Sequence, residues 1–425
     1  MKHRQQQTQH SRGCYVSLAC SIGSISIACG SLLQLNSSSD RISLQRGLFL
    51  TSLGFVYFVS LTDFFNKYLL ETRQGIQWRR KYRLMVSDVM DITNKIVSAI
   101  QAAFSCLAGF IVCKSSCSKS FLYASHFVME AYAWFGTAYF MYDIWSMYKV
   151  HTHKIADKLK LMSLSAANAQ NAAALSQCTN GGLYDKHTNH SGTKRSTATQ
   201  KDDLSPTDVD FHTKHHEDEY DYGENVELPE DGRWDFAKYI ITHPIMIMHH
   251  IFIGTFGLLV VTYLRGGFGD CVYSFIYLME FSTPFVSLRS ILSTLGLKNT
   301  RTYIINGLVM LGTFFICRIL MWPYVLYWYS EAINLPFVQA VLGLPRGCQI
   351  SILILFLPQL YWFTLMVKGA LKVFLPKKTT RVSKNNNLSP IEETSPSPVM
   401  NKANCFSKHS LKRTKSSVNG VQPQP

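Results

Sequence analysis

The chain has 425 residues, of which 47% are hydrophobic and only 16% are charged. Soluble proteins carry about 25% charged residues, so this composition excludes an ordinary soluble protein and, with apolar residues in long blocks, indicates a polytopic membrane protein. The formal net charge of +15 lies in loops and in the C-terminal tail. Because no basic stripe marks a soluble domain, positive-inside topology explains this charge better than a nucleic-acid partner.

Eight segments are long and apolar enough to cross a bilayer, which takes about 20 residues. All are expected to be helices, because open strands cannot satisfy their backbone in lipid. The predicted fold is therefore an all-α polytopic transmembrane bundle of about seven to eight spans. The first segment is Ser- and Cys-rich and resembles a signal or signal anchor, but the lack of a clear cleavage site favours a span. The predicted spans are 14–35, 44–66, 88–113, 121–148, 243–264, 270–296, 301–329 and 348–374.

The charges in the loops agree with this count. Residues 66–87 contain six Lys or Arg and one Glu, and the tail from Lys377 contains nine Lys or Arg and two Glu. Eight spans place the basic loops and both termini in the cytosol. Cys113 and Cys117 of "CKSSC" would then face the lumen, where they are expected to pair because that compartment permits disulfides.

Residues 150–232 are predicted to be a disordered cytosolic insert. The segment contains the low-complexity, alanine-rich tract "AANAQNAAALSQ", and residues 202–231 contain twelve Asp or Glu and one Lys. So few large apolar residues cannot offset the chain entropy lost on folding. The predicted organisation is an N-terminal segment at 1–43, a membrane domain in two parts at 44–149 and 233–376, the insert between them, and a disordered basic tail at 377–425.

Two adjacent histidines, His249 and His250, lie inside the apolar run "ITHPIMIMHHIFIGTFGLLVVTYL". Ionisable side chains at membrane depth are costly, so each is a functional hypothesis. A neutral imidazole can take a proton from a nucleophile or attack an activated acyl group. Neighbouring helix residues point about 100° apart, so one histidine can act on a substrate while the other supports it. Two hydrogen-bonded packing histidines are the alternative.

Other candidates lie in neighbouring spans. Glu280 and Arg318 fall at matched depth in the sixth and seventh spans, which predicts a buried ion pair with either a catalytic or a structural role. His126 and Glu130 are spaced i,i+4, so they share a helix face and are candidates for a cavity-lining polar stripe. Asp143 is a further substrate-binding candidate, although a surface Asp in an aromatic belt is the simpler interpretation.

A metal site is the competing interpretation. Residues 212–216 read "HTKHH", an HxxHH pattern, but a di-iron site needs many ligands held rigidly. No HxxxH partner is present, and the pattern lies in the predicted disordered insert. The sequence therefore predicts no bound metal and no permanently bound cofactor.

Several stretches together resemble the TLC-domain superfamily, which includes the ceramide synthases, and they are most similar to the group 3 TLC domain-containing proteins. These stretches are "IVSAIQAAFSCLAGFIV", "YDIWSMY", "ITHPIMIMHH", "LRGGFGDCVYSFIYLMEFSTPFVSLRSIL", "NGLVMLGTFFICRILMWP" and "PQLYWF". The resemblance implies a helical bundle in the endoplasmic reticulum or Golgi membrane that serves ceramide and lipid homeostasis.

The resemblance also implies roles for individual residues. His249 and His250 match the paired histidines of ceramide synthases, Glu280 matches the acidic position of "EFSTP", and Arg318 matches the arginine of the seventh span. The Asp pair and the homeobox-like region of many ceramide synthases are absent. The expected activity is N-acyl transfer from acyl-CoA, as co-substrate, to a sphingoid base. His250 is predicted to act on the substrate, with His249 and Glu280 in support. The alternative is a non-catalytic lipid-binding regulator of membrane lipid composition.

Overall fold

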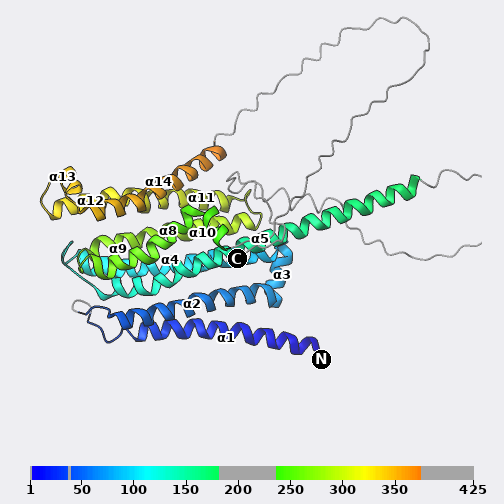
Figure 1. Cartoon of the computed structure of the whole chain (residues 1–425), viewed down its shortest axis with the longest axis horizontal. Helices are drawn as coiled ribbons and strands as arrows, with labels where there is room; N and C mark the ends of the chain where they lie inside the picture. The colour runs from blue at the N-terminus through cyan, green and yellow to red at the C-terminus, as the bar shows by residue number, and fades with distance from the viewer. Residues whose placement is uncertain (1, 37–39, 181–235, 375–425) are drawn as a thin grey trace, which may run out of the picture. The chain divides into compact units, whose positions relative to one another are not determined.

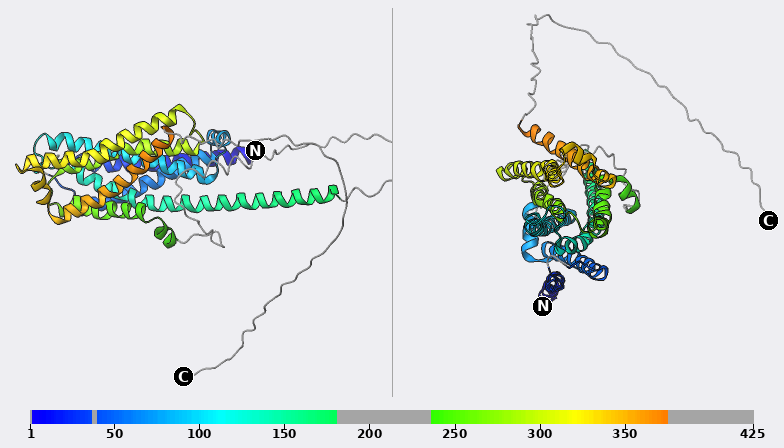
Figure 2. Two further views of the ribbon diagram at one scale, coloured as in Figure 1. Left: turned by 90° about the horizontal axis from the view of Figure 1, so that it is seen from above. Right: turned by 90° about the vertical axis from the view of Figure 1, so that its left-hand side faces the viewer.

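The computed structural model describes residues 2–36, 40–180 and 236–374. Within these ranges the chain is helical and contains no strand, as the sequence predicts. The helices run alongside one another (Figure 1), and Figure 2 shows them end on. They are α1 (Lys2–Gly30), α2 (Leu44–Glu71), α3 (Arg73–Tyr82), α4 (Val86–Val112), η1 (Cys113–Cys117), α5 (Phe127–Asn180), α7 (Phe236–Thr242), α8 (Pro244–Ile251), η2 (Phe252–Gly257), η3 (Val260–Leu264), α9 (Asp270–Leu278), η4 (Met279–Ser282), α10 (Thr283–Thr294), α11 (Arg301–Phe314), η5 (Phe315–Leu320), α12 (Met321–Ala332), α13 (Phe337–Leu342) and α14 (Arg346–Phe374).

Seven of the eight predicted spans are found as helices that are long and apolar enough to cross a membrane. Their ends differ from the predicted ends by a few residues, since hydropathy does not mark the last helical turn. Among the described residues these helices are Gly13–Gly30, Leu44–Glu71, Val86–Cys117, Pro244–Leu264, Asp270–Thr294, Arg301–Ala332 and Arg346–Leu371.

The remaining predicted span, 121–148, corresponds to the first part of α5, which begins only at Phe127. This part of the helix is less apolar than the other seven because it contains many Tyr and Trp residues in addition to Glu130 and Asp143, and those two acidic residues are 5% and 4% exposed. It packs against α2 and α4 and contributes Trp134 and Phe135 to an aromatic core cluster. The helix therefore lies among other helices, where its polar groups find partners.

The helix α5 also corrects the prediction for the insert. It continues to Asn180, so residues 150–180, predicted to be disordered, are helical. The reason is local: residues 166–177 read "AANAQNAAALSQ", and alanine has the highest intrinsic helix propensity. Residues 162–172 are exposed, and this end of α5 extends past its neighbours (Figure 1). Residues 181–232 and the tail at 377–425 lie outside the described residues.

Small side chains allow the first helices to approach one another closely. The helix α1 lies along α2 and buries Ser17, Ser21 and Ser24. A side chain at Gly54 of α2 would lie 2.6 Å from the backbone oxygen of Phe135 in α5. Membrane helices have little hydrophobic drive to associate, so close packing through small residues holds such pairs together.

Several spans depart from regular α-helix near the candidate site. The segments η2, η3 and η5 are π-helical, and η4 is a 3₁₀ turn that separates α9 from α10 just before Pro284. Proline lacks the N–H of the helical ladder, so it favours a break here. π-helical segments occur frequently at functional sites: η2 follows the histidine pair and η5 carries Arg318, while Glu280 lies in the 3₁₀ turn η4.

The predicted Cys113–Cys117 disulfide is wrong. Cys117 is bonded to Cys271 at the start of α9, and Cys113 is a free thiol. Cysteines four residues apart on a helical turn are poorly oriented for bridging, whereas the first turn of α9 packs directly on η1. The disulfide therefore links the end of the candidate span Val86–Cys117 to the start of the candidate span Asp270–Thr294.

Candidate functional site

The two adjacent histidines lie in the last turn of α8, which begins at Pro244. Proline suits the first turn of a helix, where its missing N–H would have no intrahelical partner. Because neighbouring helix residues point about 100° apart, the two rings reach different helices. His250 is buried against α5, while His249 is half-buried and faces α14.

His250 is engaged at both ring nitrogens. Its Nδ1 lies 2.8 Å from the carbonyl oxygen of Met246, and its Nε2 lies 3.1 Å from Oδ2 of Asp143. A carbonyl oxygen only accepts, and so does an ionised carboxylate, so an ionised Asp143 requires a proton on each ring nitrogen of His250. The ring therefore has no nitrogen left for another molecule.

Asp143 is buried, so the interpretation of it as a surface residue in an aromatic belt is wrong. Its Oδ1 accepts a hydrogen bond of 2.7 Å from Nδ2 of Asn94, and the same Nδ2 lies 3.0 Å from Oγ of Ser146. A buried carboxylate needs such donors to replace water. These contacts fix the carboxylate between α4, α5 and α8, where it orients His250.

His249 has a different environment. Its ring meets the Trp362 ring of α14 edge-on, with centroids 5.3 Å apart. Across 40–180 and 236–374, no residue forms a hydrogen bond or ion pair with the His249 side chain. A neutral imidazole without a polar partner can offer the lone pair of its unprotonated nitrogen to a substrate. The structure thus engages both ring nitrogens of His250 and leaves the His249 ring without a polar partner among the described residues.

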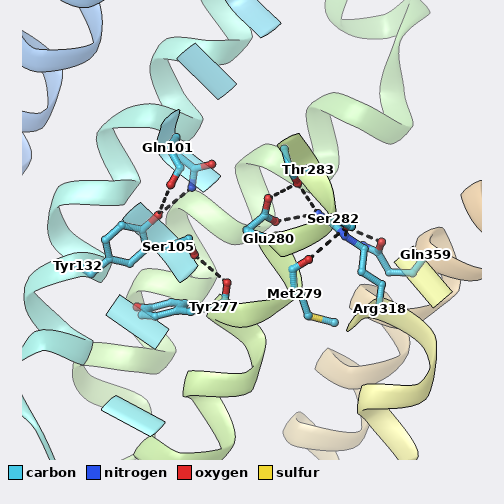
Figure 3. Close-up of polar contacts among 10 residues, drawn as sticks. All are labelled: Gln101, Ser105, Tyr132, Tyr277, Met279, Glu280, Ser282, Thr283, Arg318 and Gln359. Atoms are coloured by element: carbon cyan, nitrogen blue, oxygen red, sulfur yellow. Dashed lines mark hydrogen bonds and ion pairs between the residues drawn. The ribbon is translucent and has the colours of Figure 1, made fainter. Parts of the chain in front are cut away.

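Arg318 forms the second polar centre, shown in Figure 3. Its Nη2 lies 3.1 Å from Oε1 of Glu280, which confirms the predicted ion pair. It also donates to Thr283 from Nη2, at 2.8 Å, to Ser282 from Nε, at 2.9 Å, and to Gln359 from Nη1, at 3.1 Å. Thr283 donates in turn to Oε2 of Glu280 at 2.6 Å. The guanidinium is therefore held by three helices and can keep its charge inside the bundle.

The helix α14 brings the two centres to similar depth. Gln359 contacts Arg318 and Trp362 contacts His249. These two residues are three positions apart, so they share a face of α14 with a rise of about 4.5 Å. The free histidine and the arginine network are therefore neighbours along one helix.

A tyrosine pair lies on the other side of Glu280 in Figure 3. The Tyr132 hydroxyl accepts a 2.8 Å hydrogen bond from Nε2 of Gln101, and its ring stands edge-on to that of Tyr277, with centroids 4.9 Å apart. Ser105 donates to the backbone oxygen of Tyr277 at 3.1 Å. The polar interior therefore extends from α14 across α9 to α4 and α5.

The predicted stripe of His126 and Glu130 is not formed. His126 precedes α5, and its backbone N–H donates to Asp270 at 2.6 Å, whereas Glu130 accepts from the backbone N–H of Ile42 at 3.0 Å and pairs with Arg41 at 3.6 Å. Glu130 and Asp143 are about 20 Å apart along α5, at 1.5 Å per residue. His126 and Glu130 therefore tie neighbouring segments to the N-terminal end of α5, away from the histidine pair.

Several residues of the site were missed by the sequence reasoning. Asn94, Ser282, Thr283 and Gln359 were not singled out because uncharged polar side chains are common in membrane helices as packing contacts. Gln359 gave the clearest signal, since it is a lone amide within "SILILFLPQLYWF". Its partner, however, follows only from the packing of α14 against η5.

In the described part of the chain, no group of three or more His, Cys, Asp or Glu side chains is placed to hold a metal ion. The "HTKHH" pattern at 212–216 lies outside the described residues.

The model of one protein family, described as the TLC domain, matches residues 91–368. This match covers more than half of the chain and includes both the histidine pair and the Arg318 network, but it excludes α1, α2 and α3. No solved structure matches the chain significantly.

Proposed function

This chain belongs to the TLC-domain family, and on that premise we propose that it is a ceramide synthase-type N-acyltransferase of the endoplasmic reticulum or Golgi membrane. It would move an acyl chain from acyl-CoA to the amine of a sphingoid base. The acyl donor is a co-substrate, and the proposal needs no permanently bound cofactor.

The observation that carries the proposal is the unequal environment of the two histidines. His250 is fixed by Asp143 and by the backbone of its own helix, while the ring of His249 has no polar partner in the described structure. A general base must keep one nitrogen available for the proton that it removes. We therefore assign the reacting role to His249, in place of the sequence-based choice of His250, and a positioning role to His250 and Asp143.

The proposed reaction balances without a metal or redox partner. The amine nitrogen attacks the thioester carbonyl carbon, a C–N bond forms and the C–S bond breaks. The proton lost by the amine passes to the free nitrogen of His249 and then to the departing CoA sulfur. Arg318 keeps a positive charge near the site, which favours the oxyanion of the tetrahedral intermediate.

The disulfide supports the proposed compartment and topology. Structural disulfides form in oxidising compartments such as the lumen of the endoplasmic reticulum, so the Cys117–Cys271 bond favours a lumenal position for the segment after α4 and the start of α9. The histidine pair lies at the opposite end of its span, which favours access from the cytosol, where acyl-CoA is found. Both termini are then cytosolic.

The test is amide formation by the purified full-length protein with labelled acyl-CoA and a long-chain base. His249→Ala is expected to lose activity by about 100-fold or more, on the scale of general-base catalysis, while His153→Ala, an exposed histidine on the extension of α5, keeps it. Asp143→Asn is expected to lower activity and shift its pH profile, because it removes the charge that orients His250. Wild-type protein with no activity above a no-protein control, over several chain lengths, would contradict the proposal.

One observation favours the alternative, a non-catalytic lipid-binding regulator. An apolar groove of about 400 Å³ lies between α4 and α10, lined by residues that include Ile96, Ala103 and Pro284. Such a groove suits an alkyl chain without any chemistry. A regulator would tolerate loss of His249, so the same variants separate the two functions.

A further inference from the structure

A basic hollow lies where the chain turns back between two spans. The helix α3 connects the end of α2 to the start of α4, and both of these helices are candidate membrane spans. The hollow beside α3 has a volume of about 520 Å³, and its lining residues are Leu70, Ile76, Arg79, Arg80, Arg83 and Leu84. Because α3 joins two spans, this hollow lies at a membrane surface.

The arginines of the hollow are arranged for an anion. None of the six lining residues is acidic, and Nε of Arg79 is buried without a hydrogen-bond partner. A buried donor without an acceptor costs free energy, so an acceptor oxygen supplied from outside the chain would fit there. The guanidinium group matches phosphate oxygens in two parallel hydrogen bonds, which makes phosphate the best chemical fit.

Helix stabilisation alone explains only part of this arrangement of arginines. Basic residues in the last turn of a helix complement its dipole, and α3 ends with Arg79, Arg80 and Lys81. The dipole explains a positive charge at this end of the helix. It explains neither the hollow nor the buried Nε that lacks an acceptor.

Packed apolar side chains lie between this hollow and a groove deeper in the membrane. Leu70 and Leu84 of the hollow belong to a hydrophobic cluster that also contains Ile96 and Ile291, and these two residues line the groove between α4 and α10. Ile96 is about 15 Å along α4 from its first residue, which is half of the roughly 30 Å hydrocarbon thickness. A phosphate at the surface and an alkyl chain in the groove thus match the dimensions of one lipid.

We propose that the arginine hollow and the groove between α4 and α10 together bind one anionic phospholipid, with its phosphate on Arg79 and Arg80, one acyl chain in the groove, and the rest of that chain along the surface of the cluster that lies between them. A soluble phosphate compound shares the headgroup chemistry, but it has no use for the groove. This site lies outside the histidine centre, and it does not depend on acyl transfer.

The experiment titrates the full-length protein in detergent with phosphatidic acid or phosphatidylcholine and counts bound lipids by native mass spectrometry. Wild type is expected to bind one phosphatidic acid in preference to phosphatidylcholine. Arg79→Gln/Arg80→Gln should weaken that binding about 30-fold. A basic residue at a membrane surface contributes about 1 kcal/mol, which corresponds to about fivefold in affinity for each arginine. The matched control, Arg73→Gln/Lys81→Gln, removes two exposed charges from the same helix and should leave affinity within about threefold of wild type, since neither residue lines the hollow.

Three results would overturn the proposal. The control could weaken binding as much as the hollow variant, which would mean a diffuse surface charge effect. Micromolar CoA or millimolar inorganic phosphate could displace the lipid, which would make the ligand a soluble phosphate. A phosphatidic acid with a photoreactive acyl chain could label peptides other than those of 96–103 and 284–291. If the Gln variant does not fold, Arg79→Lys/Arg80→Lys retains the charge, and it should lose affinity because lysine cannot bind phosphate in the bidentate manner.

Discussion

The Glu280–Arg318 pair gives the sharpest quantitative prediction. At 3.1 Å and an effective dielectric of about 20, the attraction between the two charges is about 5 kcal/mol. Much of this attraction offsets the loss of water from both groups, so the measurable quantity is the cost of breaking the pair, roughly 3–5 kcal/mol for a buried pair.

The two single variants are expected to differ. Glu280→Ala leaves Arg318 with Ser282, Thr283 and Gln359, so its cost should lie at the lower end, at about 3 kcal/mol. Arg318→Ala also removes the partner of Gln359, which should raise the cost to about 4 kcal/mol. The double variant leaves no charge without its partner, so it should cost about as much as Arg318→Ala, with a coupling energy of about 3 kcal/mol.

Equilibrium unfolding by SDS in mixed micelles measures the free energy of unfolding of the wild type, the two single variants and the double variant, which together form a double-mutant cycle. The matched control is the exposed pair of Lys154 and Asp91, whose atoms lie 2.9 Å apart with side chains 42% and 16% exposed. Its coupling should be below about 1 kcal/mol. If the losses at Glu280 and Arg318 add within about 0.5 kcal/mol, the two residues do not stabilise the bundle as a pair and the reasoning fails.

Three further predictions test the packing and the topology. Cys271→Ser frees the thiol of Cys117. In sealed microsomes an impermeant maleimide should label this thiol only after the membrane is opened, because a disulfide favours the lumen, and mass spectrometry of the Cys117 peptide detects the label. Labelling in intact microsomes would contradict the proposed orientation. Gly54→Ala should destabilise the protein by about 1–3 kcal/mol, because its new methyl group would lie 2.6 Å from a backbone oxygen of α5. The control Gly23→Ala should leave the unfolding temperature unchanged, because its methyl group would meet nothing within 4 Å. Burial, together with the charges of His243 and Lys154, lowers the pKa of His151 from the usual 6.5 to about 4. As the pH drops from about 6.5 towards 4, the unfolded chain therefore binds a proton that the folded protein does not, and the stability of the fold should fall. In His151→Phe this part of the pH dependence should be absent, and an identical pH profile of stability in both proteins would refute the assignment.

The order of the spans and the depth of their polar residues follow from the sequence. Each helical residue advances about 1.5 Å along its axis, so counting from the loop ends places Glu280 and Arg318 at the same level. A buried charge needs a partner at its own level, and these two opposite charges lie at matched depth on neighbouring spans. The pairing could therefore be predicted without knowing how the helices pack.

Contacts between distant loops could not be predicted in this way. Cys117 and Cys271 are 154 positions apart, and their meeting depends on α9 packing beside η1. Cys113 was predicted as the partner because it and Cys117 flank one short loop that is expected to face the lumen, where disulfides form. Loop composition likewise concealed the extension of α5, where the helix propensity of alanine outweighs the lack of large apolar residues.

Rotation about each helix axis was the main quantity that the sequence did not determine. Hydropathy alone cannot tell which of two adjacent histidines faces α5, because lipid and the bundle interior are both apolar. The π-helical segments add to this difficulty, since each inserted residue shifts the faces of all later residues by about 100°. Only tertiary packing resolves the rotation: Asp143 draws His250 inward, and this leaves the His249 ring directed towards Trp362. The different environments of His249 and His250, on which the proposed mechanism depends, therefore arise from the packing of α8 against α5 and α14. The local sequence does not contain this information.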